Sequence, residues 1–305
     1  MKNVLITGGA GFVGVNLVAH LCEVGGYQVT VLDNETLGSR KHLEPFGAEF
    51  IAGDITNDSD LQAALRGKDV VVHLAADTRV MDSISDPKHN FFNNVVGSFK
   101  LLDACRELGV KRVIAASTGG AILGEVPAPV HEEMVASPMA PYGASKLAME
   151  GYLSAFSASY GITSCALRFS NIYGPRSYHK GSVVAHFYKQ ILAGKELIVY
   201  GDGSQARDFL YIGDLVDGIR RAIESDATGV FQLGSGRPTT VNELIEEMRS
   251  VGDQSEFKVR YEPFRAGEIH TTWCDISKSR VAFEFNPDTE LSVGLKETWD
   301  WFVRQ

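Results

Sequence analysis

The N-terminal stretch of the chain carries three glycines at a spacing typical of a phosphate-binding turn. Gly8, Gly11 and Gly14 follow the apolar run Val4-Leu5-Ile6 directly and precede a stretch with helical periodicity. Glycines at the point where a buried strand turns into a helix let the free N–H groups of that helix meet a pyrophosphate. We therefore predict a strand, a tight turn and a helix that form part of a dinucleotide site.

The rest of the first half repeats this alternation of apolar runs and helical stretches. The expected strands are residues 4–7, 28–32, 49–52, 70–74, 112–116 and 164–167. The expected helices lie near 12–24, 58–66, 87–108 and 141–160, and shorter ones follow near 182–193, 214–223, 240–250 and 292–303. Such alternation predicts an α/β fold with a doubly wound parallel sheet, whose ligand crevice lies at the carboxyl ends of the strands. The looser second half is expected to form a smaller lid over that crevice.

Composition excludes several classes of partner. The net charge is −9 over 305 residues, which disfavours nucleic acid or an anionic membrane surface as the main partner. No window approaches the roughly 18 apolar residues of a membrane span. The four cysteines, Cys22, Cys105, Cys165 and Cys274, lack metal-ligand spacing, so neither a metal site nor a disulfide framework is expected. A reducing cytoplasm suits this usage best.

Two carboxylates follow expected strands and strengthen the dinucleotide prediction. Asp33 closes the second strand, where an acid binds both hydroxyls of the adenosine ribose and repels a 2′-phosphate, which favours NAD over NADP. Asp54 closes the third strand and is placed either to meet the adenine amine or to cap the helix that follows. His73, inside the fourth strand, is read as a hydrogen-bonded core histidine rather than a ligand or base.

Tyr142 and Lys146 form the second motif, Tyr-x-x-x-Lys, on an expected helix. Residues four apart on a helix share one face, so the ammonium lies near the phenol. A nearby positive charge lowers the pKa of a phenol. The spacing therefore predicts a proton-transfer pair.

These motifs stand in an order that resembles the extended short-chain dehydrogenases/reductases of the nucleotide-sugar epimerase and dehydratase family, in particular UDP-glucose and UDP-glucuronate 4-epimerases. The resemblance covers nearly the whole chain. The matching pieces are the glycine motif, Asp33-Asn34, Gly53-Asp54-Ile55, His73-Leu74-Ala75-Ala76, Asn93-Asn94, Ala116-Ser117-Thr118, Tyr142-x-x-x-Lys146, the segments 168–176 and 201–209, and Arg265-Ala266-Gly267-Glu268.

The resemblance implies an NAD site, a catalytic site and a substrate site. The implied NAD-binding residues are Gly8, Gly11, Phe12, Val13, Gly14, Asp33, Asn34, Asp54, Ile55, Leu74, Ala75, Ala76, Asn94, Tyr142 and Lys146. The implied catalytic residues are Tyr142, Lys146, Thr118 and, less directly, Ser117; the implied substrate-binding residues are Thr118, Tyr142, Asn171, Arg207, Arg265 and Glu268. It further implies an NAD-binding domain of residues 1–168 with 209–234 returning to it, and a nucleotide-sugar-binding domain of residues 169–208 and 235–305. A homodimer is expected through the helices near 87–108 and 141–160.

The loop after Thr118 separates the reactions of this family. Its dehydratases and decarboxylases carry an acid there, whereas this chain has Gly119-Gly120. The expected reaction is therefore C4 epimerisation of a nucleotide sugar, most simply a UDP-sugar, through a 4-keto intermediate: NAD takes the hydride and returns it. The alternatives are an NDP-sugar 4,6-dehydratase or UDP-glucuronate decarboxylase, an oxidoreductase that releases NADH, and a non-catalytic NAD-binding sensor or scaffold. Leu123 departs from the usual Tyr, so loop packing is expected to differ.

The sugar itself stays open at the level of sequence. Arginines bind a diphosphate bidentately, which fits Arg207 and Arg265. Thr272 aligns with a position that limits the substituent at C2, and a small residue there would tolerate an N-acetyl group. A cation in the segment 177–181 would suit a uronic acid, and a solvated loop is the alternative there.

Overall fold

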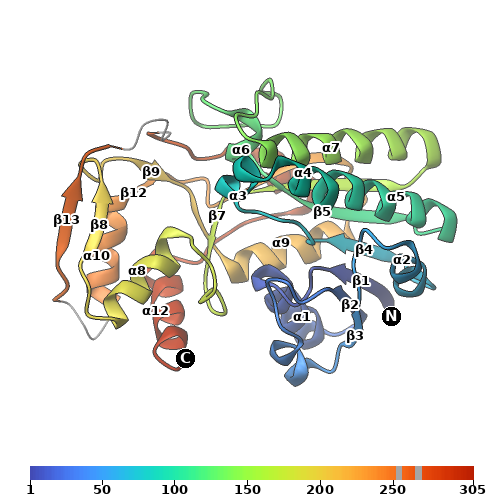
Figure 1. Cartoon of the computed structure of the whole chain (residues 1–305), viewed down its shortest axis with the longest axis horizontal. Coiled ribbons are helices and arrows are strands. Elements are labelled where there is room, and N and C mark those ends of the chain that lie inside the picture. Colours follow the sequence, from blue (N-terminus) through green and yellow to red (C-terminus); the bar gives the residue numbers. More distant parts are fainter. Residues whose placement is uncertain (252–255, 265–269) are drawn as a thin grey trace.

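The structure, a computed structural model, describes residues 1–251, 256–264 and 270–305. It has a large part built on a central sheet and a smaller part beside it (Figure 1). The sheet contains seven strands: β1 (Lys2–Thr7), β2 (Tyr27–Asp33), β3 (Glu49–Ala52), β4 (Val70–His73), β5 (Arg112–Thr118), β6 (Thr163–Phe169) and β11 (Gly229–Leu233).

All neighbouring strands of this sheet are parallel, in the order β11-β6-β5-β4-β1-β2-β3. The order reverses beside β1, which lies between β2 and β4. In open parallel sheets, ligands bind outside the carboxyl ends of the strands at such a reversal. The predicted α/β class and doubly wound parallel sheet are confirmed.

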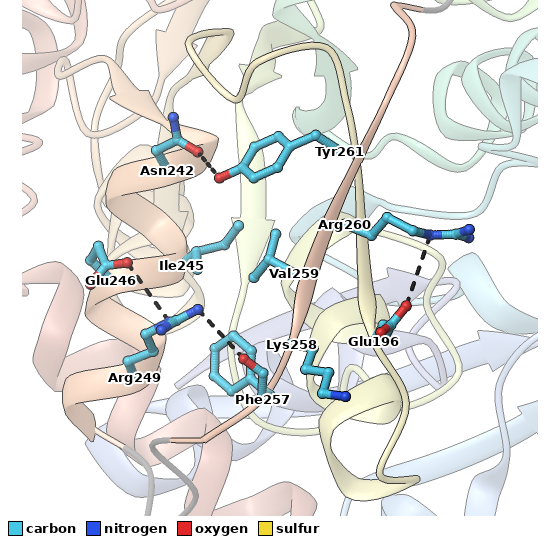
Figure 2. Close-up of a pocket in the computed structure, with 10 residues that line it drawn as sticks. All are labelled: Glu196, Asn242, Ile245, Glu246, Arg249, Phe257, Lys258, Val259, Arg260 and Tyr261. Atoms are coloured by element: carbon cyan, nitrogen blue, oxygen red, sulfur yellow. Dashed lines mark hydrogen bonds and ion pairs between the residues drawn. The ribbon is translucent and has the colours of Figure 1, made fainter.

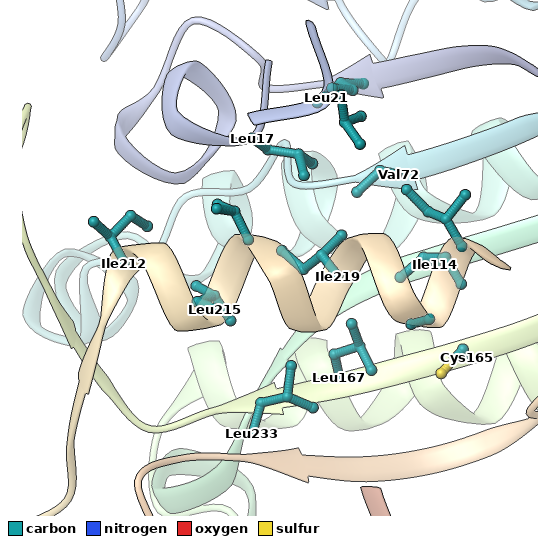
Figure 3. Close-up of a cluster of buried hydrophobic side chains, with 14 of the residues drawn as sticks. Leu17, Leu21, Val72, Ile114, Cys165, Leu167, Ile212, Leu215, Ile219 and Leu233 are labelled. Atoms are coloured by element: carbon teal, nitrogen blue, oxygen red, sulfur yellow. The ribbon is translucent and has the colours of Figure 1, made fainter. Parts of the chain in front are cut away.

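Helices cover both faces of the sheet, because the strands carry apolar side chains on each face. One face is covered by α1 (Phe12–Val24), α9 (Ile212–Glu224) and α11 (Ser277–Phe283), and the other by α2 (Asp58–Leu65), α5 (Gly97–Leu108) and α7 (Pro141–Tyr160). Figure 3 shows α9 against the sheet, where its side chains meet Leu17 and Leu21 of α1 and the strand residues Val72, Ile114, Leu167 and Leu233.

The smaller part has its own core. Its helices are α8 (Val183–Leu192), α10 (Val241–Val251) and α12 (Leu291–Phe302). Its strands pair as β7 (Asn171–Tyr173) with β10 (Phe209–Tyr211), β8 (Leu197–Tyr200) with β13 (Val259–Glu262), and β9 (Ala206–Arg207) with β12 (Thr239–Thr240). Tyr188, Leu244, Trp299 and Phe302 are buried together at its centre.

Most expected elements match within one to three residues at each end, and one helix differs in kind. The stretch expected as one helix near 87–108 consists of α4 (Pro87–Asn90), the π-helix η3 (Phe91–Val96) and α5. The short elements were not expected: α3 (Val80–Ser85), α6 (Gly119–Leu123), and the 3-10 turns η1 (Arg40–His42) and η2 (Glu44–Phe46). The strand β11 was not expected either, and it completes the sheet.

No helix in the described ranges has the length and apolar character needed to cross a membrane. Within those same ranges, no three His, Cys, Asp or Glu side chains are grouped so that they could hold a metal ion.

Candidate active site

The glycine turn connects β1 to α1 and is held by backbone packing. Gly8 has a positive φ of 70°, and a Cβ added there would lie 2.6 Å from the Ala75 nitrogen. A Cβ on Gly14 would lie 2.4 Å from the Gly9 Cα. Only glycine allows these approaches, which bring the start of α1 down onto the ends of β1 and β4. The backbone that follows β4 therefore requires glycine at position 8.

The start of α1 fits an anionic ligand. The N-cap residue is Gly11, no side chain caps the helix, and the first turn holds no acid. The first N–H groups of an uncapped helix are free donors, and the helix dipole favours negative charge there. A Cβ on Gly11 would meet only the Gly8 carbonyl oxygen, at 3.4 Å. The turn therefore fits the diphosphate of NAD.

Asp33 is held in place at the end of β2. Its carboxylate accepts hydrogen bonds from the N–H groups of Ala10 (3.0 Å) and Glu35 (2.7 Å). Burial raises its pKa, and these two bonds oppose that rise. The nearest basic side chain on the following loop, Arg40, is paired with Glu35 and so is not placed to receive a 2′-phosphate. This arrangement suits NAD rather than NADP.

Asn34 and Asp54 join the ends of β2 and β3. The Asn34 amide donates to Asp54 Oδ2 at 2.7 Å, and Asp54 Oδ1 accepts from the Thr56 N–H and hydroxyl. Burial acts to raise the pKa of Asp54, but the hydrogen bonds from Thr56 and Asn34 outweigh it, so the pKa is lowered. Helix α2 is capped by Asn57, so the helix-capping alternative for Asp54 was wrong. The Ile55 side chain is buried against Gly97, and its predicted contact with the cofactor stays a prediction.

Asn94 lies in the π-helix and is fully engaged within the protein. Its Oδ1 accepts from the Asp77 N–H, and its Nδ2 donates to the Asp77 carbonyl and to Ser145 Oγ, at 2.8, 2.8 and 3.2 Å. Ser145 Oγ in turn donates to the Tyr142 carbonyl. The side chain of Asn94 therefore ties the loop after β4 to the first turn of α7. The expected direct contact between Asn94 and NAD stays a prediction.

His73 is a buried residue with a partner on each ring nitrogen. Ser98 Oγ donates to the Asn94 carbonyl, so it accepts from the His73 Nε2–H, at 2.9 Å. The His73 Nδ1 then accepts from the Thr7 hydroxyl at 2.7 Å. Burial, and secondarily the positive charge of Lys146, lowers the pKa of His73 to about 3. The reading of His73 as a satisfied core histidine agrees with these contacts.

Because the pKa of His73 is low in the folded chain, we expect the stability of the protein to depend on pH. An unfolded histidine has a pKa of about 6.5, so between pH 6.5 and 3 the unfolded chain binds a proton that the folded chain does not. The free energy of unfolding should therefore fall by about 1.4 kcal/mol per pH unit on acidification through this window. In urea unfolding, His73→Gln should be less stable at pH 7 and should show a flatter slope with pH. The exposed His42, changed to Gln, should leave the slope unchanged; equal slopes for all three proteins would contradict the prediction.

Tyr142, Lys146 and Thr118 come together at the ends of α7 and β5. Tyr142 lies in the first turn of α7 and is 9% exposed. Its phenol is hydrogen-bonded to the Thr118 side chain. The Lys146 Nζ donates to the Ala116 carbonyl at 2.8 Å. The predicted constellation of these three side chains is therefore assembled in the folded chain.

The pKa of Tyr142 differs from the sequence-based expectation. Burial, with the Asp77 carboxylate, raises the pKa of Tyr142 to about 12, and the bond from Thr118 only partly opposes the rise. Burial also lowers the pKa of Lys146 to about 8, and the Glu150 carboxylate partly opposes this fall. The Lys146 ammonium is engaged with a carbonyl, so in the chain alone it does not bring the phenol into the neutral range.

Ser117 does not face the phenol. Its hydroxyl donates to Glu150 Oε1 at 2.6 Å, and the residue is 4% exposed. The neighbouring strand residue Arg168 binds the same carboxylate. In the chain alone the Ser117 hydroxyl therefore supports Glu150, and the catalytic role expected for Ser117 stays a prediction.

The smaller part contains a cavity of about 530 Å³. One of its lining residues, Asn171, follows the end of β6 by two residues, and β6 ends at Phe169, which pairs with Thr118 of β5. The cavity contains the predicted residues Asn171 and Arg207. Arg207 Nη1 donates to the Ala206 and His270 carbonyls, and Thr272 donates its N–H to the Ala206 carbonyl. Arg265 and Glu268 lie outside the described residues.

Sequence reasoning missed most of the residues around this cavity. These residues come from α8, from the residue directly before it and from β8, where they lie between residues of the core: Ser182, Val183, His186, Gln190, Ile198 and Tyr200. Tyr200 stands directly before Gly201-Asp202-Gly203, the one local signal that could have indicated it. The Tyr200 carbonyl accepts from Gln205 Nε2 at 2.7 Å, which fixes the turn.

A second cavity, of about 540 Å³, lies on another side of the smaller part between α10 and β13 (Figure 2). Its walls carry the hydrogen bond from Tyr261 to Asn242 and the stacking of Arg249 on Phe257. Of the residues predicted for the site, none within the described ranges lines it. The cavity next to β7 is therefore the candidate for substrate.

The loop after Thr118 is closely packed on one side and open on the other. A Cβ on Gly119 would lie 2.8 Å from the Gln232 side-chain oxygen, whereas one on Gly120 would meet nothing within 4 Å. Leu123 is fully buried in the core cluster that includes α1 and α9. Leucine at this position therefore fills core volume, and the expected difference in loop packing stays a prediction.

Comparisons with known proteins agree with this geometry. A family model described as the NAD dependent epimerase/dehydratase family matches residues 4–234. A putative UDP-glucose 4-epimerase of Methanocaldococcus jannaschii is 36% identical over 304 residues, covering 98% of this chain and 97% of that protein.

Two solved structures are similar over almost the full length. UDP-N-acetylglucosamine 4-epimerase from Methanobrevibacter ruminantium, in complex with UDP-N-acetylmuramic acid, has a TM-score of 0.94 and 36% identity, covering 100% of this chain and 99% of that one. UDP-glucose 4-epimerase from Thermus thermophilus, in complex with NAD, has a TM-score of 0.89 and 34% identity, with 99% of each chain covered.

Proposed function

The chain belongs to the NAD dependent epimerase/dehydratase family, and from this we propose that it interconverts the C4 epimers of a UDP-sugar, with NAD as its cofactor. The observation that carries the proposal is the meeting of Tyr142, Thr118 and Lys146 at the carboxyl end of β5. This group lies at the edge of the sheet where the uncapped start of α1 and Asp33 fit a dinucleotide.

Each residue has a defined part in the proposed reaction. When bound, NAD⁺ supplies the acceptor that takes and returns the C4 hydride, and a positive charge beside the phenol. Tyr142 takes the proton of the sugar 4-hydroxyl and later gives it back. Thr118 donates a hydrogen bond to the phenol oxygen and so stabilises its charged form. Lys146 holds a positive charge at the Ala116 carbonyl, next to the cofactor site.

Epimerisation is favoured over elimination by what surrounds Thr118. Neither Gly119 nor Gly120 carries a group that could move a proton to or from C5 or C6. A side chain at Gly119 would collide with Gln232. The keto sugar therefore has no acid from this loop to drive loss of water or carbon dioxide, and return of the hydride to the other face remains.

We propose that the cavity beside β7 binds the nucleotide diphosphate. Arg207 supplies positive charge to it in a protein of net charge −9, and Asn171 supplies an amide. Gln205 also lines it, and its Nε2 donates to the Tyr200 carbonyl at 2.7 Å, which holds this wall of the cavity. Arg265 and Glu268 remain proposed contacts to the diphosphate and the nucleotide ribose.

The similar proteins differ in the sugar that their names give, so the sugar needs a direct test. The purified protein is incubated, without added NAD, with UDP-galactose, UDP-N-acetylgalactosamine and UDP-glucuronate in turn, and products are followed by NMR. We expect C4 epimers at constant mass for one of them, which supports an epimerase with retained cofactor. Loss of water or carbon dioxide would overturn the proposal in favour of a dehydratase or decarboxylase. Bound NAD without turnover of any sugar would favour a sensor or scaffold.

We further propose a homodimer through α5 and α7. The outer side of these helices exposes aromatic side chains that contact one another: Phe99 and Tyr152 are 39% and 41% exposed, with ring centroids 5.2 Å apart. Tyr160, 54% exposed, stacks on Phe156. Contiguous exposed aromatics are typical of an interface. Light scattering should give twice the chain mass of 33.2 kDa; a monomer at micromolar concentration would contradict this.

Two finer assignments remain proposals. The division into an NAD-binding domain (1–168 with 209–234) and a nucleotide-sugar-binding domain (169–208 with 235–305) is supported for most of the chain by separate core clusters. Cys274, Ile276, Phe283 and Phe285 depart from it, because they pack in the core of the large sheet. Cytoplasmic location is supported by the four cysteines, all of them free thiols.

A further inference from the structure

Three consecutive residues at the end of β5 are each bonded to α7. The Ala116 carbonyl accepts from Lys146, the Ser117 hydroxyl donates to Glu150, and the Thr118 side chain is bonded to Tyr142. Tyr142, Lys146 and Glu150 are spaced four apart, so they lie along one face of the helix. The helix therefore holds the strand end through three residues. Of these, Glu150 alone has no role in the proposed proton transfer.

Glu150 is itself held from a third element. Arg168, directly across from Ser117 on β6, donates from Nε to Glu150 Oε1 at 2.9 Å and from Nη2 to Oε2 at 2.8 Å. The two side chains are 4% and 5% exposed. A buried, bidentate pair of this kind fixes the position of both partners. Arg168 and Ser117 together donate three hydrogen bonds to the Glu150 carboxylate, from β6 and β5.

Such a pair is poorly explained by stability alone. Taking two charges out of water costs about as much as their attraction returns, and apolar replacements of both partners are often neutral or stabilising. Here the negative charge stands one helical turn from the Lys146 ammonium, in the same buried region. The positive charge of Lys146 also acts on His73 of β4. Tyr142 lies one helical turn before Lys146 on α7 and feels the Asp77 carboxylate, and Arg168 of β6 pairs with Glu150.

We propose that Glu150, held by Arg168, is a positioning residue of the proton-transfer site: it fixes the end of β5 against α7, so that Thr118 and Lys146 keep their places beside Tyr142, and it keeps the Lys146 ammonium charged. Neither residue touches substrate in this arrangement. The inference rests on the proposed 4-epimerase activity and deepens it.

The test uses Glu150→Gln in the full-length protein with its bound NAD. Glutamine keeps the size of the side chain and an oxygen acceptor but removes the charge. We expect kcat to fall at least tenfold, KM for the UDP-sugar to change less than twofold, and the alkaline limb of the kcat profile to move to lower pH, because Lys146 loses its proton more easily. The double variant Glu150→Met/Arg168→Met, which removes both buried charges, should regain folding stability but not kcat.

Ser164→Ala is the matched control for a loss of stability. Ser164 Oγ donates to the Leu153 carbonyl, so this buried bond also joins β6 to α7, away from the site. It should lower the melting temperature and leave kcat and its pH profile unchanged. If Glu150→Gln lowers the melting temperature but keeps the wild-type kcat and pH profile, or if the double variant regains kcat, the inference is overturned. If the wild-type protein itself fails to interconvert any sugar, the proposed function has failed instead.

Discussion

Replacing Tyr142 by Phe should lower kcat by about 10³-fold, within the range for loss of a general acid-base group. Among the described residues of the site, the phenol is the side chain placed to take the proton of the sugar hydroxyl, since Thr118 is bonded to it and Lys146 is engaged with the Ala116 carbonyl. KM should change little, because the proposed nucleotide contacts lie in the cavity beside β7. The measurement is epimer formation by NMR under saturating UDP-sugar.

The protein should survive this change. Phenylalanine fills the same buried volume, and the lost hydrogen bond costs about 1 kcal/mol. Tyr160→Phe removes an exposed hydroxyl from the far end of the same helix and should leave kcat unchanged. Folded Tyr142→Phe protein that retains NAD and turns over at the wild-type rate would show that another group carries the proton.

Adding one methyl group at Gly14 should abolish retention of NAD. The Cβ of alanine would lie 2.4 Å from the Gly9 Cα and 2.6 Å from the Gly8 carbonyl oxygen, and these are backbone atoms that cannot rotate away. The turn must open, at a cost of about 1–3 kcal/mol for an overpacked site, and about 1.4 kcal/mol is tenfold in affinity. The NAD content of purified Gly14→Ala, measured after heat release, should fall at least tenfold, and activity with it.

The same substitution elsewhere separates cofactor loss from general damage. Gly151 lies on α7, where an added Cβ would meet nothing within 4 Å. Gly151→Ala should retain NAD and gain about 0.5–1 kcal/mol of stability, because alanine favours a helix over glycine. If Gly14→Ala purifies with a full complement of NAD, the turn does not hold the diphosphate in the way proposed here.

Local patterns predicted the half of the site that depends on the sheet. The glycine turn, Asp33 and the Tyr-x-x-x-Lys pair follow from strand ends and helix spacing, and the folded chain brings them to one edge of the sheet. The ends of α1 and α7 were also predicted, and each helix stops directly before a glycine, Gly25 and Gly161.

What local patterns could not predict depends on long-range packing. Nothing near Ser117 indicates that its hydroxyl meets a carboxylate 33 residues later. The rise in the pKa of Tyr142 comes from burial, which a helix-spacing argument does not include. The π-helix was missed because residues 91–96 carry ordinary helical periodicity, and only the bonds of Asn94 to Asp77 and Ser145 explain why the chain departs from it there.

The large sheet is completed late in protein synthesis. When residue 168 has left the ribosome, nearly all of six strands has been made, but α9 and β11 are still to come, after the first part of the smaller domain. A nascent chain of that length exposes the apolar groove that α9 later covers, where Val72, Ile114 and Leu167 lie (Figure 3). Exposed apolar surface in an incomplete chain attracts chaperones and aggregates. Because the smaller part is built from segments on both sides of α9 and β11, it cannot be exchanged as one uninterrupted segment of the chain.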